Sequence, residues 1–156
     1  MHIHILIRSL VCAAWILALS TQAIPASQEE AAPASASIVD IEISFKLDTR
    51  TTQALYMGER WVSPPAYSGA QTGKVFIVQA KAEGVDARGR VTDISPTWTV
   101  DDPEMVEVSP AQSHQVEITV RRVGQSSLNV EFKGFSKKLA VKAVIKDDVI
   151  QVQISQ

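Results

Sequence analysis

The sequence predicts an all-β protein: a β-sandwich of about seven to nine short strands, without a disulfide. Apolar and polar residues alternate in run after run, which is the pattern of strands with one face in a core. Turn residues separate these runs at spacings of roughly 8–12 residues, as in sandwiches and barrels. Beyond the N-terminal segment no stretch keeps a helical period. The single cysteine, Cys12, leaves no partner for a disulfide.

Length and charge indicate one domain that does not bind nucleic acid. The chain has 156 residues, enough for one domain of ordinary size. Its formal charge is −2, and basic and acidic residues are interspersed. Nucleic-acid-binding domains cluster their Lys and Arg residues, so we expect no nucleic-acid partner.

Residues 1–23 have the pattern of a secretory signal peptide. Arg8 supplies the charge, Ser9 to Leu19 form a short apolar core, and Thr21-Gln22-Ala23 provide the small residues of a cleavage site. The apolar run is too short to span a bilayer. We therefore expect a protein exported to the periplasm or cell surface, without a membrane span once the signal is removed. The alternative is an uncleaved N-terminal anchor.

The strands begin after a linker. Residues 24–37 are rich in Ala, Ser, Pro and Glu, a composition that predicts a flexible segment. From Ile38 to Leu47 apolar and polar residues alternate strictly, which indicates the first strand of a domain covering residues 38–156. We expect further strands at Val75–Glu83, Pro96–Val100, Met105–Val108, Val116–Val120, Leu128–Phe132, Leu139–Ile145 and Ile150–Ile154. Trp98, on the second of these, is expected to fill the core.

The region 49–74 is the least regular part of the domain, and we expect at most brief strands there, at Leu55–Met57 and Arg60–Val62. It holds three aromatic residues, Tyr56, Trp61 and Tyr67, and the pair Pro64-Pro65, which excludes a central strand there. Long loops in compact domains are often functional. One hypothesis makes the three aromatic rings a sugar-binding surface. The alternative is that they cap the sandwich.

Turns and strands follow one another in a distinctive order in the middle of the chain. They are, in order, Asp86-Ala87-Arg88-Gly89, Pro96-Thr97-Trp98, Asp102-Pro103-Glu104, Met105–Val108, Val116–Val120 and Gly124–Val130. This order of a Trp strand, a Val-x-Val strand and a Gly-x-Ser type of turn that opens a further strand resembles the bacterial immunoglobulin-like repeats of the Big, or invasin/intimin, type. The resemblance covers Val75 to Ile145 and implies an immunoglobulin-like β-sandwich of about seven to nine short strands.

The residues for catalysis or metal binding are scarce. After the signal segment His114 is the only histidine, and no cysteine remains. A zinc site would lack its Cys and His ligands, and a catalytic nucleophile would lack its usual base. Calcium needs six to eight oxygens, more than the acidic turns at 101–104 and 147–148 supply. We expect no metal, no cofactor and no enzymatic activity. A carboxylate-pair enzyme is the remaining catalytic alternative.

Three functions remain after these exclusions. The first is a non-enzymatic module that binds an envelope or extracellular protein or has a structural role in the envelope. The second is the carbohydrate-binding module, with a polysaccharide as ligand, and the third is the carboxylate enzyme. Sheet edges are candidate contact sites, and Ile38–Leu47 and Val149–Ile154 are the candidates for pairing with a partner strand. The charge-free run Ile150–Ile154 is expected to be either covered within the domain or used for association.

Overall fold

The computed structural model describes residues 37–47 and 60–156. The predicted signal peptide, all but the last residue of the predicted linker, and Tyr56 lie outside these residues. Within them all regular structure is β-strand. No helix that is long and apolar enough to cross a membrane occurs in this part of the chain.

Eleven strands follow one another along the described residues. They are β1 (Ile38–Lys46), β2 (Trp61–Val62), β3 (Ala66–Thr72), β4 (Phe76–Asp86), β5 (Val91–Asp93), β6 (Thr97–Val100), β7 (Val106–Ser109), β8 (Gln115–Val120), β9 (Gly124–Phe132), β10 (Phe135–Lys146) and β11 (Val149–Ser155).

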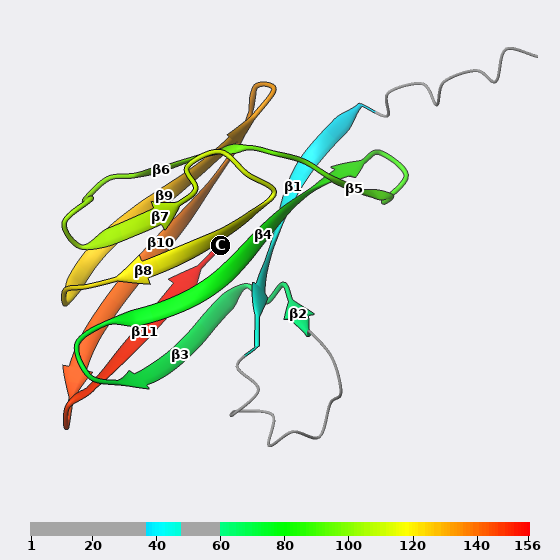
Figure 1. The fold of residues 1–156 in the computed structure, drawn as a ribbon. Helices are drawn as coiled ribbons and strands as arrows, with labels where there is room; N and C mark the ends of the chain where they lie inside the picture. Colours follow the sequence, from blue (N-terminus) through cyan, green and yellow to red (C-terminus); the bar gives the residue numbers. More distant parts are fainter. Residues whose placement is uncertain (1–36, 48–59) are drawn as a thin grey trace, which may run out of the picture. The chain divides into compact units, whose positions relative to one another are not determined.

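The strands form two antiparallel sheets that pack together (Figure 1). The first sheet has the order β2-β1-β4-β8-β7, and β5 pairs with the end of β4 beyond β8. The second sheet has the order β3-β11-β10-β9-β6. The predicted all-β sandwich is therefore confirmed, and with one cysteine in the chain it has no disulfide.

The strand order is that of an immunoglobulin domain. Seven strands, β1-β4-β8-β7 facing β6-β9-β10, reproduce the ABED and CFG sheets of the constant-type fold. Trp98 lies on β6, the equivalent of strand C, where that fold buries its core tryptophan. Its side chain is 2% exposed, and its indole N–H donates to the carbonyl oxygen of Ser113 at 3.1 Å. The expected core position of Trp98 is confirmed.

Two strands extend the second sheet beyond this core pattern. The chain turns from β10 into β11 through Asp147 and Asp148, both at positive φ, as in the type I′ turns of tight hairpins. β3 then pairs with β11 along its whole length, from Ser155↔Ala66 to Val149↔Thr72. The strand at Ile150–Ile154, expected at an edge, is therefore internal, and β3 takes the edge.

The alternation of the sequence places the core. On β4 every second residue from Phe76 to Ala82 is buried between the sheets. The ring of Tyr67 on β3 stacks on Phe45 of β1, with ring centroids 4.7 Å apart, and so joins the two sheets at one side. Gly69 lies against the ring of Phe76, where an added Cβ would come within 2.5 Å of ring carbons.

The number of strands exceeds the expected seven to nine because the 49–74 region is not only a loop. It contributes β2 and β3, and β5 adds a further short strand. The residues of β3, AYSGAQT, include only one large apolar side chain and so give a weak alternation pattern.

Candidate functional site

Of the three aromatic residues that one hypothesis makes a sugar-binding surface, the two that the structure describes, Trp61 and Tyr67, differ in burial. Tyr67 is 9% exposed and packs in the core on Phe45, so the expectation of an exposed ring does not hold for it. Trp61 is half-buried on β2, opposite Lys46 of β1, and the ammonium of Lys81 lies 5.6 Å from its ring centroid. Tyr56 lies outside the described residues. One partly exposed indole is what the described residues retain of this surface.

The acidic turn after β6 is used for local structure. The carboxylate of Asp102 accepts hydrogen bonds from the backbone N–H groups of Glu104 and Met105, at 3.0 and 3.1 Å. The guanidinium of Arg122 lies 2.9 Å from Glu104 and 3.6 Å from Asp102. These carboxylates therefore stabilise a turn, in the usual manner of Asp at such positions.

Asp101, the first residue of this turn, contacts β9, the neighbour of β6 in the second sheet. Its carboxylate accepts a hydrogen bond from the hydroxyl of Ser127 on β9, and the ammonium of Lys138 lies 3.6 Å away. The Ser127 hydrogen bond, with the charge of Lys138, lowers the pKa of Asp101. A carboxyl kept ionised in this way is a poor general acid at neutral pH.

His114 has a structural contact of its own. Its Nδ1 is 2.9 Å from the carbonyl oxygen of Ala82, and its Nε2 is 3.6 Å from Asp93. Within residues 37–47 and 60–156 no three His, Cys, Asp or Glu side chains gather in the way a metal ion requires.

Asp86 organises the turn that follows β4. Its carboxylate accepts hydrogen bonds from the backbone N–H groups of Arg88 and Arg90 and from the Arg90 side chain, at 2.7 to 2.9 Å. The hydrogen bond from the backbone N–H of Arg90 has the largest effect on the pKa of Asp86, and together these hydrogen bonds lower it. Burial acts in the opposite direction. The residue therefore holds a turn, and the same geometry explains why a carboxylate is tolerated at a 7% exposed position.

The edge of β1 is closed by side chains. The carbonyl oxygens of Ile41 and Ile43 accept hydrogen bonds from Lys137 and Gln156, at 2.8 and 3.1 Å. The N–H of Ile41 donates to the carboxylate of Asp40 at 2.7 Å, beside an irregularity in the pairing with β4. Such irregularities and bound backbone groups protect an edge against added strands. The expectation that Ile38–Leu47 offers a pairing edge therefore fails for the part that these side chains cover.

The start of β4, which extends past the end of β1, is closed in a similar way. The side-chain amide of Gln71 on β3 accepts a hydrogen bond from the N–H of Ile77 at 2.8 Å and donates one to its carbonyl at 3.1 Å. One glutamine thus takes the place of a neighbouring strand there.

β3 differs from these two edges. Two hydrogen bonds fix which of its backbone groups face β11: the N–H of Gly73 donates to the carbonyl of Asp148 at 2.8 Å, and the N–H of Gln156 donates to the carbonyl of Pro65 at 2.9 Å. In an antiparallel pair successive residues turn their backbone groups alternately toward and away from the partner strand. Residues at odd positions of β3 therefore face β11.

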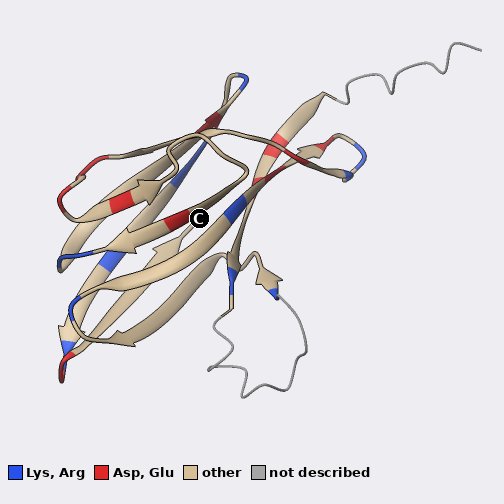
Figure 2. Cartoon of the chain, in the orientation of Figure 1, with Lys and Arg blue, Asp and Glu red and all other residues tan. Residues whose placement is uncertain are grey.

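The remaining backbone groups of β3 face away from the sheet. No described strand pairs with this side of β3. The strand carries no charged residue and no proline, and its pairing with β11 is regular over seven residue pairs. In Figure 2 both β3 and β11 are free of charged residues. We call this row the free edge; it consists of the N–H and C=O groups of Ala66, Ser68, Ala70 and Thr72.

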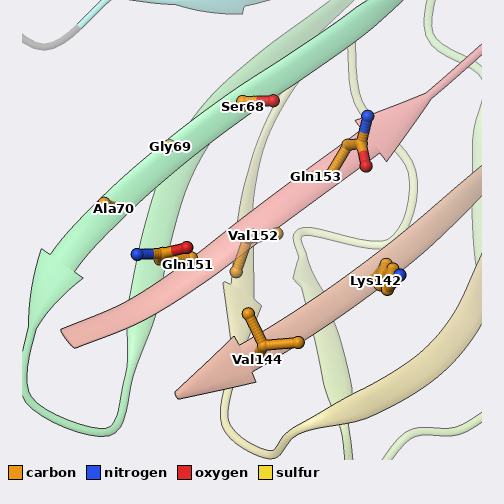
Figure 3. Close-up of a pocket in the computed structure, with 8 residues that line it drawn as sticks. All are labelled: Ser68, Gly69, Ala70, Lys142, Val144, Gln151, Val152 and Gln153. Carbon is orange, nitrogen blue, oxygen red and sulfur yellow. The ribbon is translucent and has the colours of Figure 1, made fainter. Parts of the chain in front are cut away.

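The free edge lies between two hollows. The outer hollow, of about 600 Å³, lies on the solvent face of the second sheet, over β3, β11 and β10 (Figure 3). The inner hollow, of about 420 Å³, lies between the edges of the two sheets and is lined by β3, the start of β4 and the end of β1. Three consecutive residues of β3, Ser68 to Ala70, line both hollows. A strand placed at the free edge would thus have open space for its side chains on both faces.

Sequence reasoning did not find this site. Its only sequence signal is a charge-free run between Pro65 and Lys74 inside a region read as a loop. The free edge became evident only with the pairing of β3 to the last strand of the chain.

Comparison with known proteins gives no relative from which to infer a function: no family model, no curated protein and no solved structure matches the chain.

Proposed function

We propose that this chain is an exported, non-enzymatic immunoglobulin-like module of the cell envelope that binds another protein by adding one of its strands to β3. The observation that carries the proposal is the free edge. Natural sheets usually protect long edges with charges, prolines, bulges or covering segments. β1 and the start of β4 have such protection, whereas β3 presents four residues with outward backbone groups and, among the described residues, none of these devices.

Strand addition explains why an edge of this kind would be kept open. The backbone groups supply hydrogen bonds to any extended chain, and hollows beside the edge select its side chains. The export signal at 1–23 and the resemblance to bacterial immunoglobulin-like repeats, which are part of this proposal, place the partner in the envelope or outside the cell. The local use of Asp86, Asp102 and His114 supports binding over catalysis.

The carbohydrate hypothesis has weaker support. With Tyr67 in the core, Trp61 is the one described aromatic residue of the three that remains partly exposed. A polysaccharide array with the protein and its Trp61→Ala variant measures this alternative separately from protein binding.

Site-specific photo-cross-linking in an extract of the host envelope tests the proposal. A photoreactive residue replaces Ser68 on the free edge or, as the matched control, Thr119 on the solvent face of β8. We expect a defined cross-linked protein from position 68 and none from position 119. The adduct should disappear when the position-68 protein also carries Ala70→Pro.

The proline change is chosen because the geometry makes it selective. The N–H of Ala70 faces the free edge, so proline there removes no hydrogen bond to β11 and suits an edge strand. It does remove a donor that an added strand would use. Cross-linking that is equal from both positions, or that persists in the Ala70→Pro protein, contradicts the proposal.

A further inference from the structure

The outer hollow has an ordered floor that leads from the free edge into the sheet. Two rows of outward side chains cross it, as strand pairing requires. Ser68, Gln153 and Lys142 form one row, and Ala70, Gln151 and Val144 form the other (Figure 3). The residues of β3 in these rows are small, so the hollow opens directly onto the free edge. A side chain of an added strand opposite Ser68 would face Gln153 and, behind it, Lys142.

Among the described residues, the charge that lines the two hollows has one sign. Lys142 lines the outer hollow and Lys46 the inner hollow, and within residues 37–47 and 60–156 no carboxylate lines either one. Lys142 lies on the exposed face of β10 between Gln153 and Gln125. The amide of Gln153 and the ammonium of Lys142 are both donors, so the row that starts at Ser68 fits a carboxylate.

The inner hollow fits a different side chain. Its lining combines the polar side chains of Gln71 and Gln79 with apolar residues, of which Ile77 is 44% exposed and Leu47 is partly exposed. An extended chain points successive side chains to opposite faces. A strand at the free edge would therefore place every second side chain on this side, where burial of an apolar side chain against Ile77 and Leu47 is favourable.

A second copy of this chain fits the site less well. Its own β3 would offer small side chains to the outer hollow, from Ser68 and Ala70. Toward the inner hollow it would offer Gly69 and two side chains with partners at home: Tyr67 stacks on Phe45 and Gln71 binds Ile77. Both hollows would stay largely empty.

We infer that the free edge binds an extended segment of another protein in which acidic and apolar residues alternate. The backbone of this segment pairs with β3, a carboxylate opposite Ser68 points over β3 toward Gln153 and is attracted by the charge of Lys142 behind it, and apolar side chains enter the inner hollow. This inference rests on the proposed strand addition and adds the chemistry of the partner.

Peptide titration followed by amide NMR tests the inference. One peptide has seven residues with valine at every second position and glutamate and threonine between them; the matched peptide has lysine for glutamate. We expect the acidic peptide, at concentrations up to about 1 mM, to shift and protect the amides of Ser68 and Ala70. The lysine peptide should bind several-fold more weakly.

Two variants assign the preference. Lys142→Gln should weaken binding of the acidic peptide about two- to fivefold, as an exposed ion pair allows, with little effect on the lysine peptide. Lys133→Gln is the control, because it makes the same change of net charge at the β9–β10 turn, away from both hollows. It should leave the affinity for the acidic peptide unchanged.

The outcomes separate the two claims. Equal binding of both peptides at Ser68 and Ala70, or an unchanged affinity in Lys142→Gln, overturns the acidic partner and leaves strand addition standing. No shift at these amides with either peptide overturns the inference, and the cross-link from position 68 then decides whether strand addition survives. A dimer whose dissociation frees the amides of Ser68 and Ala70 would show that a second copy is the occupant.

Discussion

Replacing Trp98 with alanine tests the placement of the immunoglobulin-like core. The indole is 2% exposed between the two sheets, and its N–H is bonded to the carbonyl of Ser113 at 3.1 Å. Removing a buried tryptophan costs about 3–5 kcal/mol, since the surrounding core closes only partly over the cavity. We expect Trp98→Ala to lower the free energy of unfolding by this amount, a large share of the stability of one domain.

A second substitution divides this cost. Trp98→Phe keeps an aromatic ring in the core but leaves the Ser113 carbonyl without its donor, which costs about 1–3 kcal/mol. Trp61→Ala is the control, because that ring is half-buried at the short strand β2. Its contact with Lys81 contributes about 0.5–1 kcal/mol.

Urea unfolding followed by far-ultraviolet circular dichroism measures all three variants. This signal does not depend on which tryptophan remains, and an unchanged slope against urea would show that the native and unfolded states are comparable. A loss well under 1 kcal/mol for Trp98→Ala would mean that the indole is not in the core. The assignment of β6 as the equivalent of strand C would then be wrong.

Two further predictions concern the turn after β4 and the strand at the free edge. Gly69→Ala should lower the free energy of unfolding by about 1–3 kcal/mol, because its Cβ would lie 2.5 Å from ring carbons of Phe76. Ser68→Ala is the control, because this side chain is in solvent, and it should change the free energy of unfolding by less than about 0.5 kcal/mol. Equal urea midpoints for the two variants would refute the close packing of Gly69 on Phe76. The pKa of Asp86 is lowered in the folded protein, so the ionised carboxylate stabilises the fold above the unfolded pKa of ~3.9, and this stabilisation is lost as the pH falls through the lower folded pKa. Asp86→Asn should therefore lose less stability than the wild type between pH 7 and pH 3. An identical pH dependence of unfolding in the two proteins would contradict the role given to this carboxylate.

The sequence predicts the fold well where each strand has one buried face. The strict alternation of Ile38–Leu47 and Val116–Val120 follows from a core on one side and water on the other, and both segments are strands of the first sheet. Trp98 could be placed because a tryptophan in a short strand after a turn has few other places to bury its ring. These features depend on neighbours close in sequence or on the hydrophobic effect alone.

The free edge could not be predicted in this way. β3 pairs with β11, some eighty residues later in the chain, and its small side chains give little alternation. The caps on β1 come from Lys137 and Gln156, which lie 96 and 113 residues further along the chain than the carbonyl groups they bind. Which edge is protected depends on these long-range contacts. The alternation pattern of the sequence does not contain them, so it indicated β1 and β11 as contact edges and did not indicate β3.

Hydrogen exchange of the β3 amides in the purified protein shows whether β3 is open to a partner strand. We expect an alternating pattern: slow exchange at Tyr67, Gly69 and Gln71, whose N–H groups face β11, and fast exchange at Ser68 and Ala70, whose N–H groups face the free edge. Slow exchange at all five residues would show that the edge is already covered and would contradict the claim that β3 is open to a partner strand.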